Sequence, residues 1–150
     1  MTPLAPQTKA PDFPLNRSDA SRLSDLQGRE YAVVYFYPRD NTPGCTIEAH
    51  GFQALYPEFR KLGAEIIGIS TQGEKSHANF ANKCGLEFPL VPDTSKEITT
   101  AYGVLGMMGS ASRVTFLVGK DGTIARVWPK VSVKSHPQEV LDAVRGLEGR

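Results

Sequence analysis

The chain has 150 residues and a formal net charge of +1, with 40% hydrophobic and 22% charged residues. This length is typical of one domain and suffices to bury a sizeable core. The near-zero charge excludes a strongly basic nucleic-acid surface, and no apolar run approaches the roughly 18 residues of a transmembrane helix. The N-terminus lacks the basic and apolar regions of a signal peptide, so we expect a cytoplasmic protein that docks on no membrane.

Strands and helices are predicted to alternate along a single domain, residues 1–150, in which the proline-containing residues 1–10 form an extended lead-in. Apolar, β-branched and aromatic runs predict strands at 31–37, 64–70, 88–91, 114–118 and 123–128. Helical spacing of apolar residues predicts helices over 43–62, 74–84, 94–102 and 137–147. This order indicates an α/β layered sheet, and the thioredoxin-like fold, a central mixed β-sheet flanked by helices, has the same order.

Cys45 is the residue whose position carries the most chemistry. Thr42 and Pro43 fit the N-cap and the first residue of a helix, which puts Cys45 in the first helical turn. Free backbone N–H groups and the helix dipole favour an anion there, and the thiolate is the reactive form of cysteine. Cys45 also shares a helix face with Phe52 and Phe59, so an inert core cysteine is an equal alternative from position alone.

The stretch Pro38-Arg39-Asp40-Asn41-Thr42-Pro43-Gly44-Cys45 resembles the P-x-x-x-T-x-x-C signature of peroxiredoxins. Flanking segments are similar to the Q-type subfamily, also called bacterioferritin comigratory protein, and include 10–13, 35–38, 62–64, 88–90 and 113–117. The resemblance extends over residues 7–147. It implies a monomeric peroxidase that reduces hydrogen peroxide and organic hydroperoxides to water and alcohols. It also implies thioredoxin or a similar dithiol protein as reductant, and no metal, haem or flavin.

The resemblance assigns roles to the residues around the cysteine. Cys45 would be the peroxidatic nucleophile, and Pro38 would cover the pocket. The Thr42 hydroxyl would accept a hydrogen bond from one peroxide oxygen and donate one to the thiolate or the other oxygen. Backbone N–H groups near Gly44 would supply further donors to the peroxide.

Arg113 lies just before a predicted strand, and the resemblance makes it the guanidinium that favours the thiolate and holds the leaving oxygen. Its position in the sequence, taken alone, predicts an arginine on the protein surface. Glu48, one helical turn beyond Cys45, would orient Arg113 through an ion pair. A first-turn acid that is stabilised by the helix dipole is the alternative for Glu48.

Cys84 is the second of two cysteines. Many Q-type members carry the resolving cysteine five residues after the first, where this chain has His50, whereas some place it on the second helix, where Cys84 lies. We expect Cys84 to condense with the Cys45 sulfenic acid into an intramolecular disulfide, after the first turn of the Cys45 helix unwinds. The alternatives are a buried thiol without a role, recycling of Cys45 by an external thiol, and an intermolecular disulfide.

Other functions remain open at this point. A thiol–disulfide oxidoreductase normally uses Cys-x-x-Cys, and the Cys45 helix lacks the second cysteine. A peroxide sensor or a chaperone-like binding module would also contain Cys45 but would not reduce peroxide catalytically. A cysteine hydrolase would need a His–Asp pair, which the sequence does not reveal. His50 should be solvated or packed, because it diverges from Cys45 around the helix, and no His or Cys spacing matches a metal site.

Overall fold

The computed structural model describes residues 2–149, so the first residue of the expected lead-in and the last of the expected domain lie outside the described residues. Its strands are β1 Pro14–Arg17, β2 Ala20–Arg22, β3 Tyr31–Phe36, β4 Ala64–Ser70, β5 Leu90–Pro92, β6 Val114–Val118 and β7 Ile124–Trp128. Its helices are α1 Pro43–Lys61, α2 Glu74–Cys84, α3 Glu97–Ala101 and α4 His136–Glu148, with a 3-10 turn η1 at Leu23–Leu26.

A five-stranded mixed sheet forms the centre, in the order β5-β4-β3-β6-β7. β3 and β4 are parallel because α1 crosses between them, whereas β6 pairs antiparallel with β3 and with β7. The register sets Tyr35 opposite Gly68 and Phe36 opposite Val114. The α/β fold expected from the sequence is confirmed, and its arrangement is thioredoxin-like.

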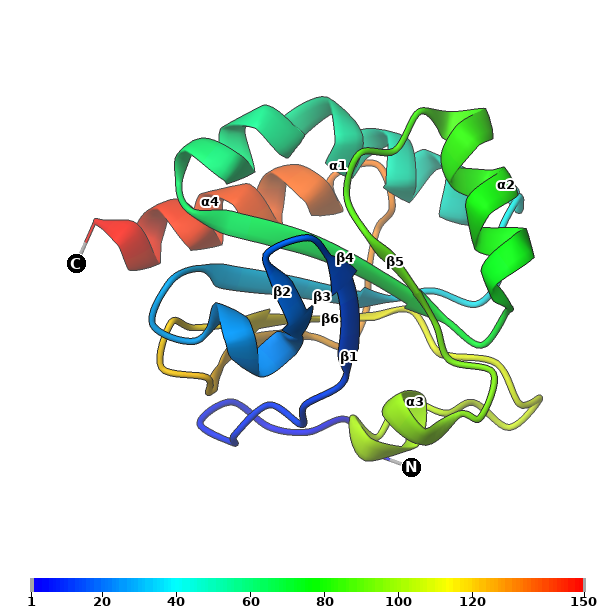
Figure 1. The fold of residues 1–150 in the computed structure, drawn as a ribbon, viewed down its shortest axis with the longest axis horizontal. Helices are drawn as coiled ribbons and strands as arrows, with labels where there is room; N and C mark the ends of the chain where they lie inside the picture. The colour runs from blue at the N-terminus through cyan, green and yellow to red at the C-terminus, as the bar shows by residue number, and fades with distance from the viewer. Residues whose placement is uncertain (1, 150) are drawn as a thin grey trace.

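The sheet separates two hydrophobic cores, and every residue of β3, β4 and β6 is buried. As Figure 1 shows, α1, α2 and α4 cover one face, whereas α3 and the N-terminal segment lie on the other. Successive β3 side chains alternate between the two cores, which explains the uninterrupted apolar run. Both cysteines belong to the core beneath α1, α2 and α4.

Two predicted elements begin two or three residues later in the structure, whereas the bounds of the others agree to within one residue. The strand predicted at 88–91 occupies Leu90–Pro92, and Phe88 instead packs its ring edge-on against Tyr35, with the centroids 6.0 Å apart. The helix predicted at 94–102 is confined to Glu97–Ala101, because Lys96 has a φ of 66°. A residue in the left-handed region cannot be part of a right-handed α-helix, so the helix begins at the next residue, Glu97.

The hairpin β1–β2 has no counterpart among the predicted elements. Its strands have four and three residues, too few for periodicity to reveal. Arg17 fixes the hairpin to the sheet through ion pairs of 2.8 Å with Glu30 and 3.1 Å with Glu65. The lead-in before it includes a turn, where Gln7 has a φ of 76° and its N–H donates to the Ile124 carbonyl. It is therefore extended only in part.

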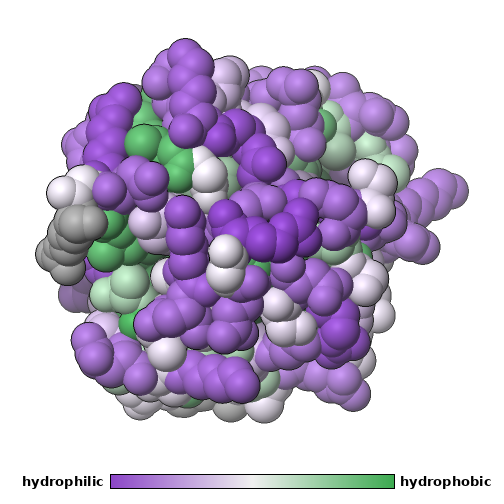
Figure 2. Space-filling view, turned by 60° about the vertical axis from the view of Figure 1, so that its left-hand side comes forward, coloured by the Kyte–Doolittle hydropathy of each residue, from purple (hydrophilic) through white to green (hydrophobic). Residues whose placement is uncertain are grey.

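Hydrophilic side chains cover most of the face drawn in Figure 2, and the hydrophobic areas between them are small and separate. Among the described residues the large hydrophobic side chains that remain exposed are Ile47, Met107 and Met108. No helix within residues 2–149 is long and apolar enough to cross a membrane.

Gly51 lies where α1 crosses α4. A Cβ at this position would lie 2.7 Å from Cγ of Pro137, a separation that atoms do not tolerate. The glycine therefore allows the two helices to approach closely, at the expense of helix propensity in α1. Gly146 on α4 offers a matched contrast, because a Cβ there would meet no atom within 4 Å.

We expect Gly51→Ala and Gly146→Ala to change stability in opposite directions. Gly146→Ala should raise the free energy of unfolding by up to about 1 kcal/mol through helix propensity. Gly51→Ala should lower it by about 1–3 kcal/mol, because the added methyl group overpacks the helix contact. Urea unfolding followed by circular dichroism measures both. A stabilised Gly51→Ala would show that the contact with Pro137 relaxes without cost.

Candidate active site

The site is built where β3 ends and α1 begins. Thr42 is the N-cap and Pro43 the first residue of α1, as predicted, so Cys45 lies in the first turn with 1% of its surface exposed. Among the described residues no side chain caps this end of the helix. The N–H groups of Gly44 and Cys45 therefore have no partner within the helix and can donate to an anion.

Arg113 reaches Cys45 because β6 pairs with β3. The antiparallel register places Val114 opposite Phe36, the last residue of β3, and so brings the preceding Arg113 beside the start of α1. Its Nη2 lies 3.3 Å from Sγ of Cys45, and its Nη1 donates to Oε1 of Glu48 at 2.7 Å. Arg113 is thus not the surface arginine that its position alone indicated.

Gly44 makes room for this guanidinium. A Cβ at position 44 would lie only 3.1 Å from Nη2 of Arg113, closer than side-chain contacts normally are. Burial alone lowers the pKa of Arg113, but the hydrogen bond to Cys45 and the charge of Glu48 raise it overall. The guanidinium is therefore a fixed positive charge beside the sulfur.

Glu48 is fully buried in the second turn of α1, and the first turn holds no acidic residue. The alternative of a first-turn acid stabilised by the dipole is therefore wrong, and the ion pair with Arg113 is present. Burial raises the pKa of Glu48 to about 7, although Arg113 opposes the shift. Its Oε2 has no hydrogen-bond partner among the described residues.

The other two motif residues, Pro38 and Thr42, lie in the segment that directly precedes the Cys45 helix. The Thr42 hydroxyl donates to the backbone carbonyl of Arg39 at 3.0 Å, so its proton is directed away from Cys45. Its oxygen keeps the capacity to accept a hydrogen bond. Pro38 is half-buried in the loop that joins β3 to α1. Proline has no N–H, so it adds no competing donor at this edge of the site.

Cys84 is the last residue of α2, and Gly85 ends the helix with a φ of 64°, as the sequence predicted. Both cysteines are buried and free, with no disulfide between them. Burial raises the pKa of the Cys84 thiol, and the charge of Lys83 offsets this only in part. The raised pKa leaves less of the Cys84 thiol in the reactive thiolate form. His50 is exposed on α1.

Two buried histidines flank the site, and no spacing in the sequence singles them out as site residues. His77 on α2 lies 2.8 Å from Oδ2 of Asp40 in the loop before α1. His136 bonds the Thr115 hydroxyl at 2.8 Å, and burial lowers its pKa to about 4. Each pair joins residues far apart in the chain, so no local spacing could have revealed it.

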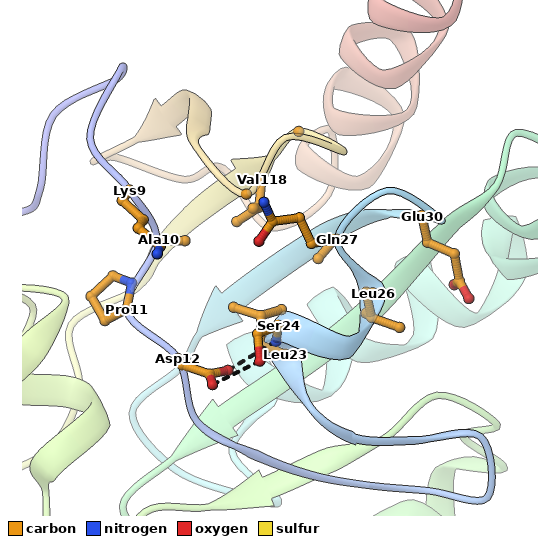
Figure 3. A pocket seen from close by; sticks show the side chains of 13 residues that line it. Lys9, Ala10, Pro11, Asp12, Leu23, Ser24, Leu26, Gln27, Glu30 and Val118 are labelled. Atoms are coloured by element: carbon orange, nitrogen blue, oxygen red, sulfur yellow. Dashed lines mark hydrogen bonds between the residues drawn. The ribbon is translucent and has the colours of Figure 1, made fainter.

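A separate cavity of about 370 Å³ lies at the opposite end of β3, near Ala32. Figure 3 shows it between the N-terminal segment, η1 and the end of β6. Asp12 at its edge already accepts hydrogen bonds from the backbone and hydroxyl of Ser24. The cavity contains none of the predicted site residues. Within the described chain no three His, Cys, Asp or Glu side chains gather closely enough to hold a metal ion.

The fold and the site together define a cysteine-dependent redox protein with a thioredoxin-like fold. The chain belongs to the AhpC/TSA family, whose profile matches residues 6–127. Peroxiredoxin Bcp of Xanthomonas campestris pv. campestris is 40% identical, with 89% of each chain covered. Peroxiredoxin Bcp of Bacillus subtilis is 38% identical over 93% of this chain and 94% of the relative.

The structure is also similar to solved structures of this family. The bacterioferritin comigratory protein of Xanthomonas campestris, solved in a trapped intermediate/ligand complex, superposes with a TM-score of 0.84. It is 36% identical, and the match covers 96% of this chain and 99% of that one. The resemblance to Q-type peroxiredoxins that the sequence indicated is confirmed.

Glu48 should give the protein a distinct pH dependence of stability. Its pKa of about 7 in the folded chain exceeds the ordinary value of 4.5, so the folded state favours the protonated form. This contribution is complete below pH 4.5 and is lost as the pH rises through 7, a change of up to about 3 kcal/mol. Glu48→Gln should abolish it.

The measurement is urea unfolding of the wild type and of Glu48→Gln between pH 4 and 8. The difference between the two curves isolates Glu48 from His136, whose lowered pKa removes stability in the opposite direction, as the pH falls from 6.5 toward 4. If the free energies of unfolding of the wild type and of Glu48→Gln changed in parallel across this pH range, the raised pKa of Glu48 would be contradicted.

Proposed function

We propose that this chain is a thiol peroxidase that reduces hydrogen peroxide and organic hydroperoxides. The observation that carries the proposal is the contact of 3.3 Å between Arg113 and the sulfur of Cys45 at a helix N-terminus. A fixed cation and free N–H groups favour the thiolate and would also stabilise an oxyanion. The Xanthomonas protein with the similar fold is described for its alkyl peroxide reduction activity, which supports the same substrate class here.

The first chemical step follows from these positions. The Cys45 thiolate attacks one peroxide oxygen, the O–O bond breaks, and the sulfur becomes a sulfenic acid. The second oxygen leaves as hydroxide or alkoxide and takes up a proton to become water or alcohol. Arg113 and the first-turn N–H groups of α1 stabilise the charge on that oxygen. Thr42 accepts a hydrogen bond from the peroxide, Pro38 covers it, and Glu48 holds Arg113 in place.

The second step regenerates the thiol through Cys84. Its sulfur attacks the Cys45 sulfenic acid, water leaves, and an intramolecular disulfide forms. Two electrons from thioredoxin or a similar dithiol protein then reduce the disulfide to two thiols. Because one chain carries both cysteines, the cycle is complete in a monomer. Recycling of Cys45 by an external thiol is the alternative when Cys84 does not take part.

The first test treats the reduced protein with one equivalent of hydrogen peroxide. We expect the intact monomer to lose two hydrogens and a peptide map to show Cys45 linked to Cys84. Cys84→Ser should instead gain one oxygen on Cys45, and Cys45→Ser should not react. Mass spectrometry reads all three. Oxygen on Cys45 in the wild type without a link would assign recycling to an external thiol, and an unreactive Cys45 would contradict the proposed function.

Arg113→Ala should slow the oxidation of Cys45 by about a hundredfold, because one donor to the developing oxyanion is lost. Stopped-flow oxidation by hydrogen peroxide measures the rate. Arg126→Ala is the matched control, because that arginine stacks on Trp128 and has no contact with Cys45. An unchanged rate of Cys45 oxidation in Arg113→Ala would remove the residue from the site.

A further inference from the structure

A buried polar cluster joins the loop that carries the peroxiredoxin motif to the helix that carries Cys84. Its centre is Asp40, which is 6% exposed and lies between β3 and α1. The Asp40 carboxylate accepts hydrogen bonds from the Tyr37 hydroxyl at 2.6 Å and the Ser76 hydroxyl at 2.7 Å. The Asp40 backbone N–H also donates to the side chain of Gln72, so main chain and side chain are both held.

His77 completes the cluster from the first half of α2, where it is 3% exposed. Its Nδ1 lies 2.8 Å from Oδ2 of Asp40, and its Nε2 lies 3.2 Å from the carbonyl oxygen of Val91. The Asp40 carboxylate can only accept, so His77 Nδ1 donates a proton to it, and Nε2 also lies 3.4 Å from the Ser70 hydroxyl. A hydrogen bond to an ionised carboxylate is charge-assisted and stronger than a neutral one.

The pair connects the two segments that the proposed reaction must bring together. Asp40 lies in the same loop as Pro38 and Thr42, directly before α1, whose first turn carries Cys45. His77 lies on the helix that ends with Cys84. Both cysteines are buried and unlinked, Cys45 in the first turn of α1 and Cys84 at the last residue of α2. We expect at least one of these segments to move before the two sulfurs meet disulfide geometry.

We propose that Asp40 and His77 are positioning residues that set the fate of the Cys45 sulfenic acid, by latching the motif loop to α2 until the pair opens. This inference rests on the proposed function. While the latch is closed, the loop and the first turn of α1 keep the arrangement in which Cys45 meets peroxide. When it opens, the loop and α2 are free to bring the two sulfurs together.

The latch has a chemical consequence because a sulfenic acid has two fates. Attack by the Cys84 thiol gives a disulfide and water, whereas a second peroxide molecule oxidises the sulfenic acid to sulfinic acid. A latch that opens rarely prolongs the sulfenic acid and favours the second fate. Weakening the pair should therefore speed disulfide formation and protect Cys45 from over-oxidation, with little effect on the first oxidation step.

The test compares the wild type with Asp40→Asn, which keeps the shape of the side chain and removes its charge. The reduced protein is mixed with hydrogen peroxide and quenched over time, and mass spectrometry follows sulfenic acid, disulfide and sulfinic acid. Ser76→Ala is a milder second variant that deletes one hydrogen bond to Asp40. Asp93→Asn is the control, because that carboxylate is equally buried but bonds Thr99 of α3.

We expect Asp40→Asn to form the disulfide roughly tenfold faster, the effect of weakening a hydrogen bond to a charged group. The amount of sulfinic acid formed under excess peroxide should fall, and the first oxidation step should stay at the wild-type rate. Ser76→Ala should change disulfide formation and sulfinic acid in the same directions, but by smaller amounts. In the double variant Asp40→Asn/His77→Gln, the two changes should be non-additive, as expected for partners in one interaction.

Two results would overturn the latch while leaving the peroxidase intact. One is disulfide formation in Asp40→Asn and Ser76→Ala at the rate of Asp93→Asn. The other is slower disulfide formation in Asp40→Asn, which would mean that the pair assists resolution. A wild-type Cys45 that is oxidised but never links to Cys84 would overturn the latch and the resolving role together. A wild-type Cys45 that does not react would overturn the proposed function itself.

Discussion

The antiparallel pairing of β6 with β3 is the constraint on which the rest of the site depends. It places Arg113 against the first turn of α1, so that a guanidinium and a cysteine 68 positions apart in the chain lie 3.3 Å from each other. β3 is buried on both faces, and a shift of one residue would turn every side chain of β6 to the opposite face. The two cores therefore fix the register, and the register fixes the site.

Arg113 reduces the energetic penalty of burying the Glu48 carboxylate beside it. Glu48 is fully buried, and a carboxylate without a partner there would be strongly unfavourable. The ion pair of 2.7 Å offsets that penalty only in part, which is why the pKa of Glu48 stays raised, to about 7. In return Glu48 fixes the direction of the guanidinium, and Gly44 leaves the space that its Nη2 occupies. The ion pair, the burial of Glu48 and the missing side chain at Gly44 together fix the position of the Arg113 guanidinium beside Cys45.

The same region must be rigid for one reaction and mobile for the next. Peroxide attack needs fixed donors around Cys45, whereas the proposed disulfide with Cys84 needs at least one of the two cysteine-bearing segments to move. The structure holds the motif loop through side-chain hydrogen bonds to α2, centred on Asp40. Such bonds open without unfolding the sheet, because the strands are held by their own ladder and by both cores.

The sequence by itself determined the fold class, the strands and helices of the sheet, the helix start at Thr42 and Pro43, and the place of Cys45 in the first helical turn. These follow from local periodicity, capping residues and a motif within one short stretch, which need no knowledge of distant contacts. It missed the hairpin β1–β2, which is too short to be periodic, and the pairing of Asp40 with His77. The family resemblance predicted Arg113 beside Cys45 and its ion pair with Glu48, but the tertiary structure decided both over a surface arginine and a first-turn acid, because strand register and burial are properties of the packed chain.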